Sequence, residues 1–219
     1  MDITKHPRLS VVVPTQEMED REFFFKRLLE SLWNQSFQDF EIVVTDNSED
    51  DTIKGICEWY KTGIRYYRNP GKGMAPNTNE GIRLSKGQIV KILYMDDYLL
   101  HDDVLDMTIK KFNTGAKWVI AGANNNYNPH WTDDVYSGNN KLGSPSALAF
   151  VNKGPLLFDE TLTWLLDCDI YKRLHDKYGD PVCMHGKHIG IGEGLHQATH
   201  LISDDRKLSE YHYLVQKHA

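Results

Sequence analysis

Short apolar runs alternate with stretches of helical periodicity along the first hundred residues. The apolar runs are rich in Val, Ile and aromatic side chains, and they predict strands at residues 9–15, 40–45, 64–67 and from residue 89 onward. The stretches between them predict helices at residues 21–35, 51–61 and 77–85. Strands that alternate with helices at this rhythm favour βαβ units, a parallel sheet and right-handed crossovers.

The second half of the chain alternates less regularly. Its predicted helices cover residues 103–112, 163–178 and 203–217, and its predicted strands cover residues 117–123 and 146–151. The polar stretch between these strands, residues 124–143, is predicted to be a long loop, and loops of that length in a compact domain are usually functional or disordered. With no repeat, low-complexity tract or linker, the pattern predicts one α/β domain over residues 1–219.

Several predicted strands of the first half end on polar residues. The first strand ends on Pro14 and Thr15, the second runs into Asp46, and the run that begins at residue 89 ends on Asp96 and Asp97. In parallel α/β sheets, ligands bind beyond the carboxyl ends of the strands. Adjacent carboxylates repel each other and are costly to desolvate, so they face solvent, a cation or a basic partner. We therefore predict a ligand site at this edge rather than an inert solvated turn.

Charge and cysteine content narrow the class of protein. The net charge of -6 and the pI near 5.9 argue against a nucleic-acid partner held by phosphate neutralisation. Cys57, Cys168 and Cys183 are few and widely spaced, so we expect no disulfide framework and a reducing compartment. The first residues lack the apolar core of a signal peptide, and no apolar run approaches the roughly 18 residues that span a bilayer. These features predict a soluble, cytoplasmic protein without a transmembrane segment.

The usual glycine-rich phosphate loops are missing from the sequence. Neither GxGxxG after the first strand nor GxxxxGK[ST] occurs, which argues against dinucleotide oxidoreductases and P-loop NTPases. The glycines of residues 190–194 fit neither motif and predict a flexible turn. A phosphorylated ligand then needs a metal and basic groups, and Asp96 and Asp97 supply the oxygen ligands that Mg²⁺ and Mn²⁺ prefer. The nearest upstream basic residues are Arg65, Arg68 and Lys72.

Five motifs in a fixed order carry a resemblance to a known family. They are residues 11–15 (VVVPT), 41–48 (EIVVTDNS) with 50–52 (DDT), 79–82 (NEGI), 86–87 (KG) and 96–99 (DDYL). In this order they resemble the motifs of family 2 glycosyltransferases of the GT-A fold. The resemblance is good over residues 9–105 and weaker from there to about residue 203. The resemblance implies a Rossmann-like mixed central sheet, mostly parallel and flanked by helices. It also implies a nucleotide-sugar-binding half at residues 1–99 and an acceptor-side half, with the C-terminal helix, at residues 100–219.

The same resemblance implies an activity and a set of donor-site residues. The activity is an inverting transfer from a nucleotide-diphosphate sugar, a UDP-sugar by default, to a glycan or other hydroxyl acceptor, assisted by Mn²⁺ or Mg²⁺. Asp96 and Asp97 form the metal–diphosphate site, although the sequence does not say which of them holds the metal, because Tyr94 stands where many members have the first acid. The residues implied to bind the nucleotide sugar are Pro14, Thr15, Asp46, Arg68, Lys72, Asn79 and Asp96.

A second acidic segment, residues 166–174 (LDCDIYKRL), resembles the family motif that precedes a helix and contains the general base. The resemblance makes Asp167 the base, with Leu166 in place of a preceding Glu, and leaves Asp169 as the alternative. Inversion by single displacement needs one carboxylate to take the proton of the acceptor hydroxyl. Because Asp167 and Asp169 are two residues apart on a predicted helix, they point in different directions and do not act as a pair.

His196 and His200 form an HxxxH motif, which on a helix places both imidazoles on one face. Gln197 stands where zinc peptidases have their Glu, and an amide cannot act as a general base, so we reject the peptidase hypothesis. Within the transferase hypothesis, His196 is the predicted third group at the metal or diphosphate. The glycines of residues 190–194 then let this segment close over the bound donor.

Two other functions remain open. An inactive nucleotide-sugar-binding module fits the loss of acids at Tyr94 and Leu166. A nucleotidyltransferase shares this type of sheet, but it usually has a glycine-rich loop with a basic residue after the first strand, unlike residues 14–18 (PTQEM). Acceptor choice is predicted to lie in residues 124–143 and beyond.

Overall fold

The computed structural model describes residues 6–60, 63–71, 73–154, 156–192, 194 and 197–219. The strands are β1 (Leu9–Thr15), β2 (Phe40–Asp46), β3 (Ile64–Arg68), β4 (Ile89–Ile92), β5 (Tyr98–Leu99), β6 (Trp118–Ala123), β7 (Leu148–Val151) and β8 (Val182–Gly190). The α-helices are α1 (Arg21–Trp33), α2 (Thr52–Tyr60), α3 (Met74–Leu84), α4 (Val104–Asn113), α5 (Leu166–Tyr178), α6 (Ala198–Leu201) and α7 (Asp204–His218). Two short 3₁₀ helices are η1 (Val135–Ser137) and η2 (Pro145–Ala147).

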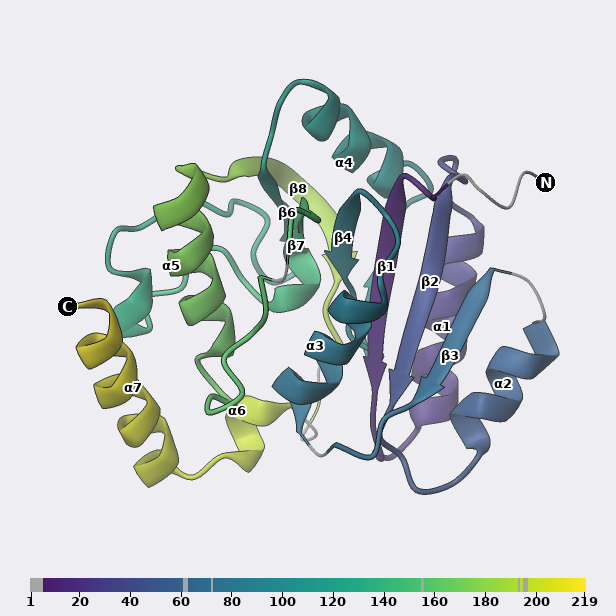
Figure 1. Ribbon diagram of the computed structural model, residues 1–219, viewed down its shortest axis with the longest axis horizontal. Helices are drawn as coiled ribbons and strands as arrows, with labels where there is room; N and C mark the ends of the chain where they lie inside the picture. The colour runs from purple at the N-terminus through teal and green to yellow at the C-terminus, as the bar shows by residue number, and fades with distance from the viewer. Residues whose placement is uncertain (1–5, 61–62, 72, 155, 193, 195–196) are drawn as a thin grey trace.

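One mixed sheet joins all of these strands in the order β3-β2-β1-β4-β7-β6-β8-β5. The strands β1 to β4 are parallel to one another, β7 is antiparallel to both of its neighbours, and β5 is antiparallel to β8. The predicted mixed, mostly parallel sheet flanked by helices is therefore confirmed. Figure 1 shows that the carboxyl ends of β1, β2 and β4 point to the same edge of the molecule.

Two apolar cores lie on opposite faces of the sheet, because successive side chains of a strand alternate between faces. Val11 and Val13 of β1 belong to the core that is covered by α1, α2 and α4. Val12 belongs to the other core, which is covered by α3, α5 and Leu214 of α7. The sheet is thus a rigid platform between two helical layers (Figure 1). No helix of the described residues is both long and apolar enough to cross a membrane.

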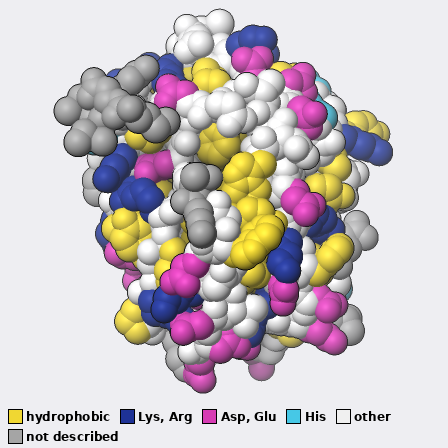
Figure 2. Space-filling view, turned by 90° about the vertical axis from the view of Figure 1, so that its right-hand side faces the viewer, with side chains coloured by type: hydrophobic (Ala, Val, Ile, Leu, Met, Phe, Trp, Pro, Cys, Tyr) yellow, Lys and Arg dark blue, Asp and Glu magenta, His cyan; other side chains and the backbone are white. Residues whose placement is uncertain are grey.

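Apolar side chains also gather on the surface beside α2 and β3 (Figure 2). Trp59 of α2 is exposed and meets Tyr60 edge to face, and Tyr60 stacks on Trp33 of α1 with ring centroids 4.3 Å apart. This surface lies at the end of the sheet that is farthest from α5 and α7.

Several predicted elements differ from the observed ones. Helix α3 begins at Met74, three residues before its predicted start, and α5 begins at Leu166 rather than at residue 163. Strand β8 was not predicted, because its alternation is broken at Gly186, which has φ +111°, and because polar side chains interrupt it. The polar stretch of residues 124–143 does form a connection between β6 and β7, and it contains η1.

Candidate active site

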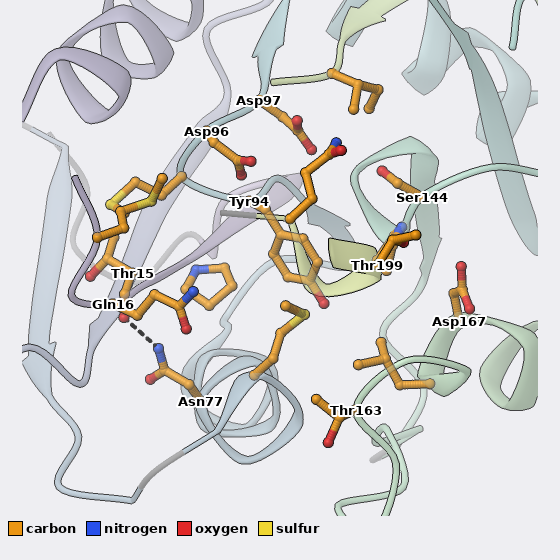
Figure 3. A pocket seen from close by; sticks show the side chains of 18 of the residues that line it. Thr15, Gln16, Asn77, Tyr94, Asp96, Asp97, Ser144, Thr163, Asp167 and Thr199 are labelled. Carbon is orange, nitrogen blue, oxygen red and sulfur yellow. Dashed lines mark hydrogen bonds between the residues drawn. The ribbon is translucent and has the colours of Figure 1, made fainter. Parts of the chain in front are cut away.

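A cavity of about 240 Å³ opens at the carboxyl edge of the sheet (Figure 3). The end of β1, the start of α3 and the turn after β4 form one side of the cavity, and the segment that enters α5 forms the other side. The lining residues on which the argument depends are Pro14, Thr15, Asn77, Tyr94, Asp96, Asp97, Ser144, Trp164 and Asp167. The pocket therefore brings together residues that are up to 185 positions apart in the sequence, from Pro14 to Thr199.

Asp46 lies directly beneath the pocket and does not line it. Its carboxylate is fully buried and accepts hydrogen bonds from Thr15 Oγ1 (3.0 Å), Ser48 Oγ (2.6 Å) and Tyr66 Oη (2.8 Å). Thr15 itself is a lining residue, so Asp46 fixes the orientation of a pocket side chain. Asn77 completes this corner, because its Nδ2 donates to the carbonyl oxygens of Thr15 and Thr45, both at 2.9 Å.

Besides Asp46, two of the predicted donor-site residues, Arg68 and Asn79, do not line the pocket. Arg68 donates to the Ser48 carbonyl (2.7 Å) and pairs with Asp51. Asn79 is buried, and its side chain is bonded to the backbone of Phe158 through both a donor and an acceptor atom. The structure therefore places Asn79 in the packing between α3 and the segment before α5, because its amide satisfies buried backbone groups there. The predictions for Lys72 and His196 fall outside the described residues.

The Asp96–Asp97 turn after β4 is held from several directions. The Asp97 side chain is 3% exposed, and Oδ1 accepts a hydrogen bond from the Gly192 backbone N–H at 2.8 Å. The carbonyl oxygen of Asp96 accepts from Arg27 Nη2 at 2.6 Å, and the Arg27 guanidinium lies over the Tyr98 ring. Burial, and next the charge of Asp96, raise the pKa of Asp97 above its ordinary value. A cation at this turn would offset both the burial of the Asp97 charge and its repulsion by the charge of Asp96.

Gly190 and Gly192 are sites of close approach in the structure. A Cβ on Gly190 would lie 2.4 Å from the Tyr98 ring, and a Cβ on Gly192 would lie 2.4 Å from the Asp96 carbonyl oxygen. Both distances are far below van der Waals contact, so these positions need glycine for packing. The predicted flexible turn is thus partly wrong, because Gly190 ends β8 and Gly192 is bonded to Asp97.

Substitution of Gly192 by alanine tests this packing. Because the clashing atom belongs to the backbone, we expect Gly192→Ala to displace the Asp96–Asp97 turn and to cost about 1–3 kcal/mol of unfolding free energy. Gly55→Ala is the matched control, because a Cβ there meets no atom within 4 Å and α2 gains a better helix former. Chemical denaturation measures both variants. Equal stability of Gly192→Ala and the wild type would contradict the close approach.

Asp167 faces the pocket from the first turn of α5, across the cavity from Asp96 and Asp97 (Figure 3). Its Oδ1 accepts from the Cys168 backbone N–H at 2.7 Å, and its Oδ2 accepts from Asn140 Nδ2 at 2.8 Å. Burial outweighs these hydrogen bonds and raises the pKa of Asp167 to about 6. A carboxylate with such a pKa is ionised at neutral pH and remains basic enough to accept a proton.

Asp169 is fully buried on another side of α5 and does not line the pocket. Its carboxylate is paired with Arg173 (2.7 Å), Lys217 (2.7 Å) and His218 (2.9 Å). The alternative assignment of Asp169 as the base therefore has no support from its position, because its oxygens are occupied by Arg173 of the same helix and by Lys217 and His218 of α7.

Tyr94 stands between the two acidic ends of the pocket (Figure 3). Its hydroxyl is buried and has no hydrogen-bond partner among the described residues. The backbone N–H of Tyr94 donates to Ser146 Oγ at 2.9 Å, which holds the turn in place. Tyr94, which by the resemblance stands where many members of the family have an acid, is thus a pocket residue with a buried hydroxyl.

Asn77 and Asn140 were not among the predicted site residues, although both are hydrogen-bonded to pocket residues. Asn77 lies at the edge of a predicted helix, and Asn140 lies in the loop predicted to be functional, so composition alone pointed to their segments and not to the side chains. Gln197 also lines the pocket, and its Nε2 donates to the Gly192 carbonyl at 2.9 Å. Within the described residues, no group of three or more His, Cys, Asp or Glu side chains is arranged to hold a metal.

Comparisons with known proteins show the family and the fold of the chain. Residues 10–175 match the family described as Glycosyl transferase family 2. A GalNAc(5)-diNAcBac-PP-undecaprenol beta-1,3-glucosyltransferase of Campylobacter jejuni is 36% identical over 119 residues, which are 52% of this chain and 37% of that protein. A poly(ribitol-phosphate) beta-glucosyltransferase of Bacillus spizizenii is 30% identical over 100 residues, covering 42% of this chain and 15% of that protein. The matches thus span well under half of these curated relatives.

Two solved structures share the fold. S. aureus TarS 1–349 in complex with UDP-GlcNAc has a TM-score of 0.69 at 17% identity, covering 90% of this chain and 61% of that one. The mannosyltransferase PcManGT from Pyrobaculum calidifontis, in complex with GDP-Man and Mn²⁺, also has a TM-score of 0.69 at 17% identity, covering 99% and 66%. The chain belongs to glycosyl transferase family 2 and has the GT-A fold.

Proposed function

We propose that this protein transfers a sugar from a nucleotide-diphosphate sugar to a hydroxyl acceptor with inversion at the sugar carbon. The observation that carries the proposal is one pocket with adjacent acids at one end and a single half-buried acid, Asp167, at the other. The acceptor oxygen forms a bond to the sugar carbon while the bond from that carbon to the diphosphate oxygen breaks. Asp167 takes the proton that the acceptor hydroxyl loses.

The Asp96–Asp97 turn is the proposed metal and diphosphate end of the pocket. Carboxylate oxygens suit Mn²⁺ or Mg²⁺, and the like charges on a buried turn favour a divalent cation there. Asp96 and Asp97 would hold such a cation, which when bound would stabilise the charge of the departing diphosphate. The donor half at residues 1–99, the acceptor-side half at residues 100–219 and the contact of Pro14 and Thr15 with the base remain part of this proposal.

Thermal unfolding in the presence of nucleotides tests the donor site. TarS was solved with UDP-GlcNAc, and PcManGT was solved with GDP-Man and Mn²⁺. The probes are therefore UDP, GDP, UDP-GlcNAc and GDP-Man, each with and without Mn²⁺. A ligand at 100 times its Kd adds about 2.7 kcal/mol of stability, which in a chain of this size raises the Tm by roughly 5–10 °C. We expect at least one nucleotide to produce such a rise, and to produce a larger one with Mn²⁺.

The variant Asp97→Asn is expected to lose the Mn²⁺-dependent part of that rise. Asp102→Asn is the matched control, since its side chain is exposed outside the pocket. If no nucleotide stabilises the wild type under any condition, the donor site is wrongly assigned. Stabilisation without hydrolysis or transfer would instead favour the inactive-module alternative, and release of diphosphate from a nucleoside triphosphate would favour a nucleotidyltransferase.

A further inference from the structure

Asn140 lies in the connection between β6 and β7, and its side chain reaches the carboxylate that faces the pocket from α5. We propose that Asn140 is a positioning residue, which holds the Asp167 carboxylate in the orientation from which it accepts the proton of the acceptor. This role rests on the proposed function. It connects the stretch predicted to select the acceptor with the group that activates the acceptor.

The Asn140 amide has one possible orientation. Its Oδ1 accepts hydrogen bonds from the backbone N–H groups of Leu142 (2.8 Å) and Gly143 (3.1 Å), so this atom must be the oxygen. Its Nδ2 donates one hydrogen to the Gly143 carbonyl (3.0 Å) and the other to Asp167 Oδ2 (2.8 Å). All four hydrogen-bonding positions of the amide are used. The side chain therefore always presents a donor to Asp167.

The same turn is tied to α5 by a second side chain. Tyr171 is fully buried one turn after Asp167, and its hydroxyl lies 3.1 Å from the Gly143 carbonyl and 3.0 Å from the Ser144 carbonyl. Ser144 lines the pocket. The loop end and the helix start consequently form one rigid unit, in which Asn140 is the group that contacts the reacting carboxylate.

Besides Asn140, three titratable groups face Asp167, and one of them, the Cys168 thiol, is also hydrogen-bonded to the Asp167 carboxylate. They are Tyr94 on the turn after β4, and Cys168 and Tyr171 on α5. Burial raises the pKa of each of the three above its ordinary value, so all remain neutral near neutral pH. Asp96 and Asp97 lie across the cavity (Figure 3). A donated hydrogen bond favours the ionised carboxylate, and the Asn140 bond lowers the pKa of Asp167 against the effect of burial.

Asn140→Asp removes the donor and leaves the loop its acceptor, because a carboxylate can still accept from the Leu142 and Gly143 N–H groups. Asn140→Ala removes both functions. Asn139→Ala is the matched control, since the side chain of the neighbouring Asn139 donates to Asp134, and neither residue lines the pocket. We expect the plateau rate of both Asn140 variants to fall roughly tenfold to a hundredfold, as for other misplaced reacting groups. Asn139→Ala should retain the wild-type rate.

The pH profile distinguishes positioning from a merely structural role. We expect the acidic limb of the rate profile to move to higher pH in both Asn140 variants, and farther in Asn140→Asp because two carboxylates then face each other. A ¹³C carboxyl NMR titration of Asp167, assigned by its loss in Asp167→Asn, should show the same order without any turnover. Suppose that Asp167→Asn loses its activity, while both Asn140 variants keep the wild-type plateau rate, the wild-type acidic limb of the pH–rate profile and the wild-type NMR titration of Asp167. The role of Asn140 is then overturned, and the proposed function stands. If Asp167→Asn transfers sugar at the wild-type rate, the assignment of Asp167 as the base and the role of Asn140 both fail.

Discussion

Asp167→Asn is expected to lower the rate of sugar transfer by about 10²–10⁴-fold, which is the usual contribution of a general base. The amide has nearly the same shape as the carboxylate and can still accept from the Cys168 N–H, but it cannot take a proton from the acceptor. In the wild type, the rate should rise with pH through about 6 and level off above 7, because Asp167 must be ionised to act. Initial-rate measurements between pH 4.5 and 9 provide the test.

Donor binding separates the loss of the base from the loss of the fold. The donor end of the pocket lies across the cavity from Asp167, so Asp167→Asn should show the wild-type thermal shift with the nucleotide and Mn²⁺. Its own stability should equal or exceed that of the wild type, since it removes a buried charge. Transfer at the wild-type rate, or a flat pH profile in the wild type, would exclude Asp167 as the base.

The end of the pocket that we propose binds the donor could be located from local sequence. Asp96 and Asp97 follow an apolar run directly, and the parallel order of β1, β2 and β4 follows from strand–helix alternation. The parallel register of β1 with β2 and β4 then brings the polar carboxyl ends of these strands to one edge of the sheet. Asp46 illustrates the limit of this approach, because the sequence located it at the right edge and could not show that its carboxylate is used by Thr15 and Ser48.

The acceptor side could not be predicted in the same way, because its contacts are nonlocal and irregular. Asn140 meets Asp167 across 27 residues with no periodicity to align them. Strand β8 pairs with β6 through a register shift between Ala121 and Ala123, which hides the alternation that identifies a strand. Family resemblance favoured Asp167 over Asp169 as the base, and the folded chain shows a difference that the sequence does not: Asp167 lines the pocket, whereas Asp169 is paired with Lys217 and His218 of α7.

Helix α7 supports the start of α5 through two buried acids. Glu210 of α7 accepts hydrogen bonds from the backbone N–H groups of Thr163, Trp164 and Leu165, at 2.9, 2.8 and 3.0 Å, which would otherwise be unpaired at this helix start. The Asp169 carboxylate of α5 is in turn paired with Lys217 and His218 of α7. The position of Asp167 depends on both connections.

Asp169→Asn should therefore impair stability far more than chemistry. Removing this charge takes the carboxylate partner from Arg173 and breaks the buried cluster with Lys217 and His218, a kind of change that costs about 3–5 kcal/mol when all partners are buried. Lys217 keeps its ion pair with Asp159 at 2.6 Å. Arg173 and Lys217 retain 28% and 27% side-chain exposure, so we expect a smaller loss. The estimate is about 2–4 kcal/mol, or a decrease in Tm of roughly 5–15 °C.

Asp176→Asn provides the comparison on the same helix, because Asp176 forms an exposed i,i+4 pair with Lys172. Exposed pairs contribute about 0–1 kcal/mol, so this variant should unfold nearly as the wild type does. At a temperature where Asp169→Asn is still folded, its transfer rate should stay within about threefold of the wild type, since Asp169 does not face the pocket. A stable but inactive Asp169→Asn would reverse the two assignments. It would make Asp169 the base and Asp167 a structural acid, against the positions of both carboxylates.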